Sequence, residues 1–268
     1  MLFQFIMREA VDCEITPTEI GKRCPSWFWM TDSDYFIDLG NVKLFEHSKE
    51  VLEKYPSTPR FFNYQYARFL EDLFHELPKI ASPIPADLYA YINTEDKLCS
   101  LYTTLFDLDW WDNEKSKKIQ YAIEDNVSEN LVSNGSFINM PPNMSGQFFH
   151  VNDEVILRYE ARGRDDEDDV SWWTAINGEY RLKYQTFIDE VEDLLHRFFA
   201  RMDRQVEGVV KNFTPTEVEH SNIVVEHEER RKYFYGILDS VKQGKYESLI
   251  DWDQVRSDLI CVLKNSSR

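Results

Sequence analysis

The sequence FFHVNDEVILRY, at residues 148–159, indicates that this chain contains an antiparallel sheet. Two apolar runs flank Asn152-Asp153, a dipeptide typical of the tight turn of a β-hairpin. Further along, Trp172–Ala175 and Glu179–Leu182 flank Asn177-Gly178, which is the strongest short-range hairpin signal in the chain. The middle of the chain is therefore predicted to form sheet through two hairpins.

On the N-terminal side of these hairpins, residues 1–46 predict a meander of short antiparallel strands. The expected strands are Leu2–Met7, Trp27–Met30, Tyr35–Leu39 and Val42–Phe45, with turns at Thr31–Asp34 and at Gly40-Asn41. From Phe61 the apolar spacing becomes helical, and Pro78 is expected to end this helix. Pro83 and Pro85 open a second, short helix, and Asn113–Val132 predicts another.

On the C-terminal side, the pattern is helical. Thr186 with Asp189 resembles a capping box, and helical spacing then continues to Val206. The tail predicts a helix over Ser221–Gln243 stopped by Gly244, and a last helix from Asp251, as its N-cap, to Lys264. The predicted fold class is α+β: antiparallel sheet regions packed with several helices and a helical C-terminus. We expect a single domain over 1–268, with a division into a mixed core at 1–210 and a helical extension at 211–268 as the alternative.

The composition predicts a folded, anionic protein. The chain has 48 acidic and 30 basic residues, a net charge of -18, and 43% hydrophobic residues, which suffice for a packed core. No stretch of eighteen apolar residues occurs, so a membrane span is not expected. The opening residues lack the basic segment and cleavage site of a signal peptide, and we expect the protein in the cytosol. A field of this sign repels nucleic acid and acidic membranes and attracts basic partners.

The acidic residues gather in two places, and both lie beside paired tryptophans. Asp107, Asp109 and Asp112 surround Trp110 and Trp111, and the run Asp165, Asp166, Glu167, Asp168 and Asp169 precedes Trp172 and Trp173. At an interface, acids steer the encounter and aromatic anchors supply the affinity, so these residues are the candidate partner-binding site. The structural alternative is a solvated acidic loop next to tryptophans that belong to the core.

No motif for chemistry occurs in the sequence. The phosphate-loop, dinucleotide-binding and nucleophile-elbow patterns are all missing, so we expect neither a catalytic residue nor a cofactor. His227-Glu228 starts like a zinc-protease helix, but Arg231 stands where the second histidine would be. The five-acid run lacks the spacing and glycine of a calcium loop, so no metal is expected. The four cysteines are expected to be reduced.

Several segments together resemble an uncharacterised bacterial family, a domain of unknown function associated with polymorphic toxin loci. They are WFWMTDSDYFIDLG at 27–40, YQYARFLEDLFHELP at 64–78, WTAINGEYRL at 173–182, and EHEERRKYF followed by DWDQVR within 226–256. The resemblance covers almost the whole chain, and the acidic insert at 165–169 is longer than the family pattern. It implies an immunity protein but carries over no functional residue.

Two hypotheses of function follow. The first is an acidic cytosolic binding protein, an immunity protein that neutralises a cognate secreted toxin by direct binding. The partner would be a basic protein such as a nuclease toxin, which must be basic to hold a polyanion, and neither nucleic acid nor membrane would be bound. The alternative is an enzyme or small-ligand protein whose site is built from dispersed carboxylates and histidines.

Overall fold

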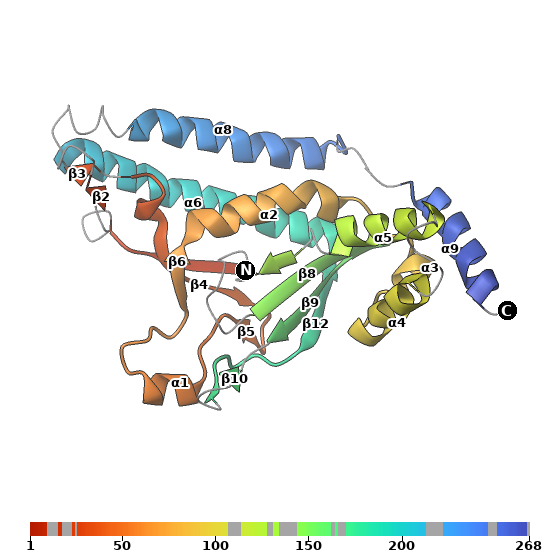
Figure 1. The fold of residues 1–268 in the computed structure, drawn as a ribbon. Helices are drawn as coiled ribbons and strands as arrows, with labels where there is room; N and C mark the ends of the chain where they lie inside the picture. The colour runs from red at the N-terminus through yellow and green to blue at the C-terminus, as the bar shows by residue number, and fades with distance from the viewer. Residues whose placement is uncertain are drawn as a thin grey trace.

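A computed structural model shows that the chain has an α+β fold, in which antiparallel sheets pack with helices (Figure 1). The structure describes residues 1–9, 16–17, 23–24, 26–106, 114–127, 131–133, 144–161, 164–165, 170–212, 222–245 and 251–266. Within these ranges the predicted fold class is confirmed. None of the described helices is both long enough and apolar enough to cross a bilayer.

The N-terminal sheet is built around one central strand. Its strands are β1 (Phe3–Met7), β4 (Asp32–Asp38), β5 (Lys43–Leu44) and β6 (Phe62–Gln65), and β4 pairs antiparallel with the other three. A small ribbon of β2 (Thr16–Pro17) and β3 (Arg23–Cys24) lies between β1 and β4 in the sequence. The predicted strand over Trp27–Met30 and the turn over Thr31–Asp34 are wrong. A 3-10 helix, η2 (Trp29–Thr31), lies there instead and buries Met30 and Thr31, and β4 begins directly after it at Asp32.

The central sheet contains the hairpin predicted around Asn152-Asp153. Its strands, in spatial order, are β12 (Gly178–Lys183), β9 (Glu154–Ala161), β8 (Met144–Val151) and β7 (Leu131–Ser133). The predicted hairpin is confirmed, since Val151 pairs with Glu154 and Asn152 adopts a left-handed conformation with φ 56°.

The second predicted hairpin, around Asn177-Gly178, is wrong. Strand β12 pairs with β9 and not with Trp172–Ala175, and the Asn177 side chain accepts a hydrogen bond from the Ala161 backbone N–H at 3.1 Å. The segment Trp172–Ala175, predicted to pair with β12, bonds to a different part of the chain: the Thr174 N–H donates to the Glu46 carbonyl at 2.9 Å. A short ribbon of β10 (Arg164–Asp165) and β11 (Val170–Ser171) lies in sequence between β9 and β12, two strands of this same sheet.

Helices cover both faces of the central sheet and so produce two cores. The helices are α1 (Lys49–Lys54), α2 (Tyr66–Ala81), α3 (Ala86–Tyr89), α4 (Glu95–Phe106), α5 (Glu114–Val127), α6 (Tyr184–Asn212), α8 (Ile223–Lys242) and α9 (Trp252–Ser266). Phe148 and Leu157 face a large core shared with α2, α6 and α8, whereas Phe149 and Ile156 face a smaller core shared with α3, α4, α5 and α9. This alternation is what a strand buried on both faces requires.

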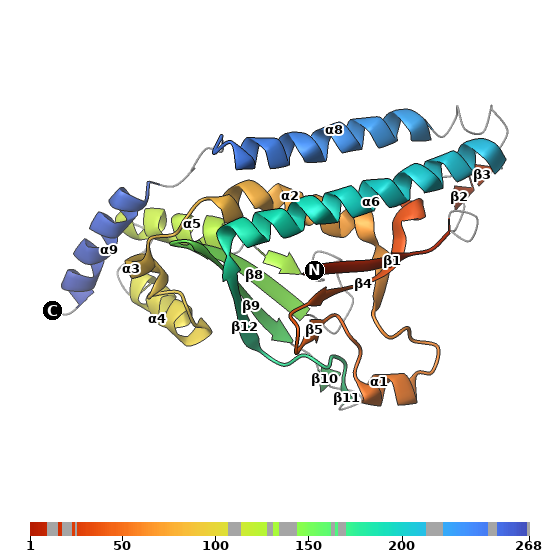
Figure 2. The ribbon, with the colours of Figure 1, turned by 180° about the vertical axis from the view of Figure 1, so that it is seen from behind.

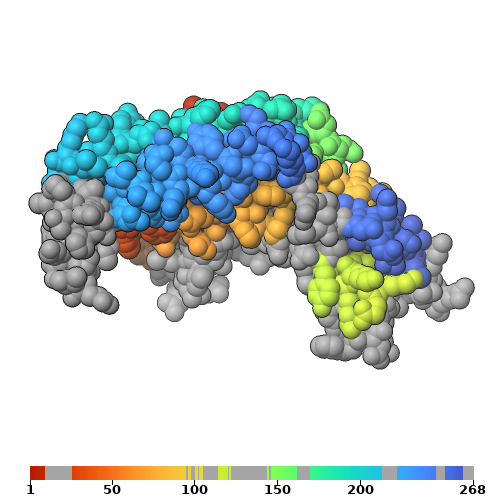
Figure 3. All heavy atoms as spheres, turned by 90° about the horizontal axis from the view of Figure 1, so that it is seen from above, coloured from red at the N-terminus to blue at the C-terminus, as the bar shows by residue number. Residues whose placement is uncertain are grey.

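A layer of helices, α2, α6 and α8, packs on the two sheets, and α6 connects them. Helix α6 contacts β1 of the first sheet and both β9 and β12 of the second, and it runs along both of them when the molecule is seen from behind (Figure 2). Helix α8 packs against α2 and α6, and the view from above shows it lying along them (Figure 3). Helix α9 packs instead on α4 and α5. The two C-terminal helices thus join different cores, and the proposed division at residue 210 stays a prediction.

Several helix boundaries differ from the sequence expectation. The helix predicted over Asn113–Val132 ends at Val127, and strand β7 begins at Leu131. Helix α2 begins at Tyr66 rather than Phe61 and passes through Pro78 to Ala81, because Ile80 and Ala81 are completely buried and their packing outweighs the lost backbone hydrogen bond. Helix α6 begins at Tyr184, so Thr186 lies inside its first turn and not at its cap. The predicted stop of α8 at Gly244 is confirmed by its φ of 64°, and the Asp251 cap is confirmed by its carboxylate, which accepts from the Gln254 N–H at 3.0 Å.

Candidate functional site

The predicted partner-binding residues fall almost entirely outside the described part of the chain. These are Asp107, Asp109, Trp110, Trp111, Asp112, Asp166, Glu167, Asp168 and Asp169. Asp165 is described as the end of β10, where it pairs with Val170 of β11. Of the chain's 48 acidic residues, 14 lie outside the described ranges, together with only 3 of its 30 basic residues. More than half of the net charge therefore belongs to these segments.

The described elements next to the two acidic segments belong to different parts of the fold. Residues 107–113 connect α4 to α5, which contribute to the smaller core. Residues 166–169 connect β10 to β11, and β11 packs against α1. There the Ser171 backbone N–H donates to a Glu50 carboxylate oxygen at 3.3 Å. The sequence alone gave no indication of this separation.

The tryptophans that follow the five-acid run are largely internal. Trp173 is 4% exposed, belongs to the large core and stacks on His47 with ring centroids 4.8 Å apart. Trp172 is half-buried and stacks on Tyr55 at 5.8 Å. Trp173 is therefore a core residue and not an anchor for a partner, because a side chain this deeply buried stabilises the core.

The buried histidines are held by hydrogen bonds within the fold. His47 Nδ1 lies 2.8 Å from the Pro59 carbonyl, and burial lowers the pKa of this imidazole. His150 Nδ1 lies 2.9 Å from the Ala81 carbonyl, and the ring stacks on Tyr184. Each contact fixes the orientation of its ring and links a strand or loop to a neighbouring element.

His227, singled out for its zinc-protease-like context, lies in a network between α6, α8 and the N-terminal segment. Trp27 Nε1 donates to His227 Nδ1 at 3.1 Å, and His227 Nε2 lies 2.9 Å from Asp203 Oδ1. The Arg230 guanidinium lies 4.4 Å from the centre of the Trp27 ring and forms ion pairs to α2 and α8. We call this group the Trp27 network. Both imidazole nitrogens of His227 have partners in this network, which connects the segment of Trp27 to helices α2, α6 and α8.

A second group of polar side chains is buried along α2. Glu76 is 6% exposed, and its Oε2 is buried without a hydrogen-bond partner, as is the Tyr35 hydroxyl on β4. Burial, opposed by Lys79 and reinforced by Asp72, raises the pKa of Glu76 from 4.5 to about 7. Burial likewise raises the pKa of Tyr35 well above its ordinary value, and Asp72 adds to this. Asp72 is therefore the charged neighbour that Tyr35 and Glu76 share.

This α2 group is the best candidate for chemistry among the described residues. Buried polar atoms without partners are rare, and carboxyl groups that titrate near neutrality are common at functional sites. Two bases approach Glu76 Oε1: His75 Nε2 at 3.5 Å and Lys79 Nζ at 3.8 Å. Such a carboxyl could exchange a proton near pH 7. Sequence reasoning missed Glu76, although a charged residue on the apolar face of a predicted helix was a detectable signal.

No cation site accompanies this group. The described residues contain no cluster of three or more histidine, cysteine or acidic side chains arranged to hold a metal ion. The one cysteine whose side chain is described, Cys261, is not in a disulfide, and its sulfur accepts a hydrogen bond from Lys115 Nζ at 3.5 Å.

Fold and surface together define an acidic α+β protein with helices on both faces of a central antiparallel sheet. The chain belongs to a family of unknown function, DUF5984, which it matches over residues 2–258. This confirms the expected membership of an uncharacterised family, while the association with toxin loci stays a prediction. Neither a curated protein nor a solved structure matches the chain.

Proposed function

We propose that this protein is an acidic binding protein that captures a basic polypeptide, and that it acts in the cytosol as an immunity protein against a secreted toxin. The observation that supports this most strongly is the distribution of charge. The segments at 107–112 and 165–169 carry eight acidic residues and no lysine or arginine.

The charges of the described elements are largely matched by opposite charges nearby. Arg230 pairs with Glu71 at 2.5 Å, Arg256 with Asp87 at 2.7 Å, and Lys242 with Glu192 at 2.8 Å. Acidic side chains with such partners contribute little to a long-range field. The two acidic segments would then dominate the field that a basic partner meets, and complementary charge speeds association by steering the encounter.

Co-expression tests the proposal directly. The protein is produced together with the product of the neighbouring gene, and growth of the host and recovery of a complex are measured. We expect a stable complex and relief of toxicity. No complex together with unrelieved toxicity would refute the immunity role.

A matched pair of charge reversals tests whether the acidic run forms the interface. Asp168→Lys/Asp169→Lys and Glu229→Lys/Asp239→Lys change the net charge by the same amount, and the second pair lies at exposed positions of α8. We expect the first pair to slow association at low salt by about tenfold or more and the second pair to have a much smaller effect. Equal effects of both pairs would show that only the overall field matters.

The alternative function, an enzyme or small-ligand protein with a carboxylate site, is favoured by the α2 group. Glu76 and Tyr35 have the burial and unpartnered atoms that such a site presents. If Glu76→Gln or Tyr35→Phe abolished protection in the co-expression test while the complex still formed, the carboxylate site would be the functional one.

A further inference from the structure

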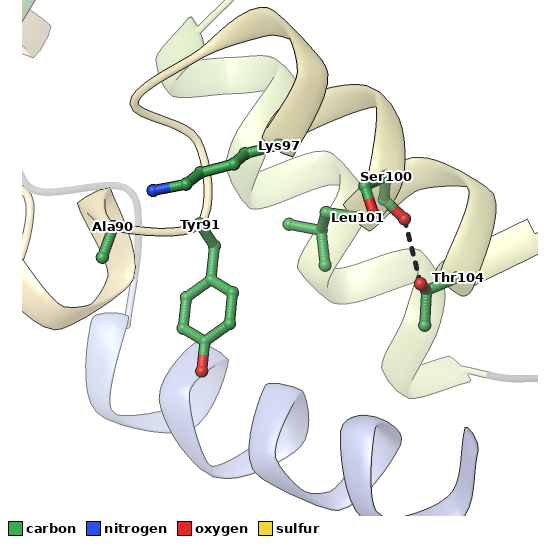
Figure 4. A pocket seen from close by; sticks show the side chains of 6 residues that line it. All are labelled: Ala90, Tyr91, Lys97, Ser100, Leu101 and Thr104. Carbon is green, nitrogen blue, oxygen red and sulfur yellow. Dashed lines mark hydrogen bonds between the residues drawn. The ribbon is translucent and has the colours of Figure 1, made fainter. Parts of the chain in front are cut away.

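A hollow of about 350 Å³ opens on the surface beside α4, on the side of the smaller core (Figure 4). The described residues that line it are Ala90, Tyr91, Lys97, Ser100, Leu101 and Thr104. Four of them follow the spacing i, i+3, i+4, i+7 along α4 and so share one face of that helix. The volume lies at the lower end of the range for small-molecule sites.

One wall of the hollow carries positive charge. The Lys97 ammonium donates to the Asn93 side-chain oxygen at 2.9 Å, which orients the cation through a neutral acceptor and leaves its charge in place. The Thr104 hydroxyl, one turn further along α4, donates to the Ser100 carbonyl at 2.9 Å. Figure 4 shows the Lys97 ammonium directed toward Ala90, away from the Ser100 and Thr104 hydroxyls, so the positive charge of this otherwise acidic chain stands at one end of the hollow.

The floor and the opposite wall are apolar. Leu101 is 5% exposed and belongs to the smaller core, whereas Tyr91 is 42% exposed. Figure 4 shows the Tyr91 ring standing across the hollow from Leu101, with its hydroxyl directed toward α9. Arg256 of α9 donates to both carboxylate oxygens of Asp87 at 2.7 and 3.1 Å, and this fixes α9 against the segment that carries Tyr91.

We propose that this hollow binds a small organic monocarboxylate with an apolar body. The carboxylate would accept a hydrogen bond from Lys97, and the apolar body would contact Leu101 and the Tyr91 ring. A single ammonium matches one negative charge, and a dianion such as phosphate would be repelled more strongly by a protein of net charge -18. The apolar floor favours a ligand with a hydrocarbon part over a bare inorganic ion.

The test uses 3-phenylpropionate as the probe, titrated into the full-length protein by calorimetry. Lys97→Gln removes the ammonium, and Ala90→Phe fills the hollow from an exposed position. The matched control is Lys118→Gln, which removes one positive charge at an exposed position of α5 that does not line the hollow. The uncharged 3-phenylpropionamide and inorganic phosphate serve as control ligands.

We expect 3-phenylpropionate to bind the wild type and the Lys118→Gln variant alike, and to bind the Lys97→Gln and Ala90→Phe variants at least about tenfold more weakly. The amide and phosphate should each bind at least about tenfold more weakly to the wild type. Absence of binding to the wild type, equal binding by Lys97→Gln, or equal binding of the amide would each overturn the proposal. Phosphate binding as tightly as the probe would overturn the requirement for an apolar body. These outcomes are independent of whether the protein captures a toxin.

Discussion

Replacing Glu76 by Gln is expected to stabilise the protein at neutral and alkaline pH. Glu76 lies on the buried side of α2, and burial raises its pKa from 4.5 to about 7. In the unfolded chain the carboxyl ionises with its ordinary pKa, so between these two values the folded state binds more protons than the unfolded state. The free energy of unfolding therefore falls as the pH rises through this window, and the loss is complete above about pH 7.

The magnitude follows from the size of the pKa shift. Each pKa unit corresponds to about 1.4 kcal/mol, which sets an upper limit of about 3 kcal/mol. Solvent still reaches part of the carboxyl, since its side chain is 8% exposed, and this screening reduces the expected effect to about 2 kcal/mol. Glutamine has nearly the same shape and no charge at any pH, so Glu76→Gln avoids this loss.

Urea denaturation between pH 5.5 and 8.5 measures the difference. This range lies above the isoelectric point of about 4.7, so the chain keeps a net negative charge. The stability gap between Glu76→Gln and wild type should widen from pH 5.5 to about 7.5 and then stay constant at about 2 kcal/mol. Glu229→Gln, at an exposed position of α8, is the control and should show a flat difference within about 0.5 kcal/mol. A Glu76→Gln variant less stable than wild type at pH 8 would refute the reasoning, because it would mean that Lys79 and His75 stabilise the ionised carboxylate.

Three further predictions concern stability. Trp27→Phe removes the indole donor of the Trp27 network and should lower the free energy of unfolding by about 2 kcal/mol in urea denaturation; no change would mean that the network is dispensable. Gly178→Ala should lower the melting temperature, since a Cβ there would collide with the ring and hydroxyl of Tyr159. Gly236→Ala has open space around it in α8 and should raise the free energy of unfolding by up to about 1 kcal/mol. A Gly178→Ala variant more stable than Gly236→Ala would contradict this packing. Asp251→Ala should cost about 1 kcal/mol and increase hydrogen exchange at the start of α9, and Asp251→Asn should retain the cap.

The hairpin at residues 148–159 and the ends of the two C-terminal helices could be predicted because the interactions that form them are local. The left-handed Asn152, the glycine stop at Gly244 and the Asp251 cap each involve residues within a few positions of one another. The same kind of reasoning failed at Asn177-Gly178. The turn signal is present there, but β12 pairs with β9, which lies more than fifteen residues earlier in the chain.

Little of the candidate site could be predicted. Of the ten residues chosen for their charge and aromatic neighbours, Asp165 alone lies in the described part of the chain. The Trp27 network went unpredicted because its members are far apart in sequence, whereas in the α2 group only Tyr35 is distant from the residues of that helix. Trp27 and His227, for example, are separated by 200 positions and meet through a 3.1 Å hydrogen bond.

By itself the sequence determined the fold class, the anionic character and most of the helices, because composition and short-range periodicity control these properties. The tertiary structure alone decided which strands pair, that α2 continues through Pro78, and that Trp173 and Glu76 are buried. The physical reason is that pairing and burial depend on the free energy of contacts between distant segments, which can outweigh local preference and which no window of neighbouring residues contains.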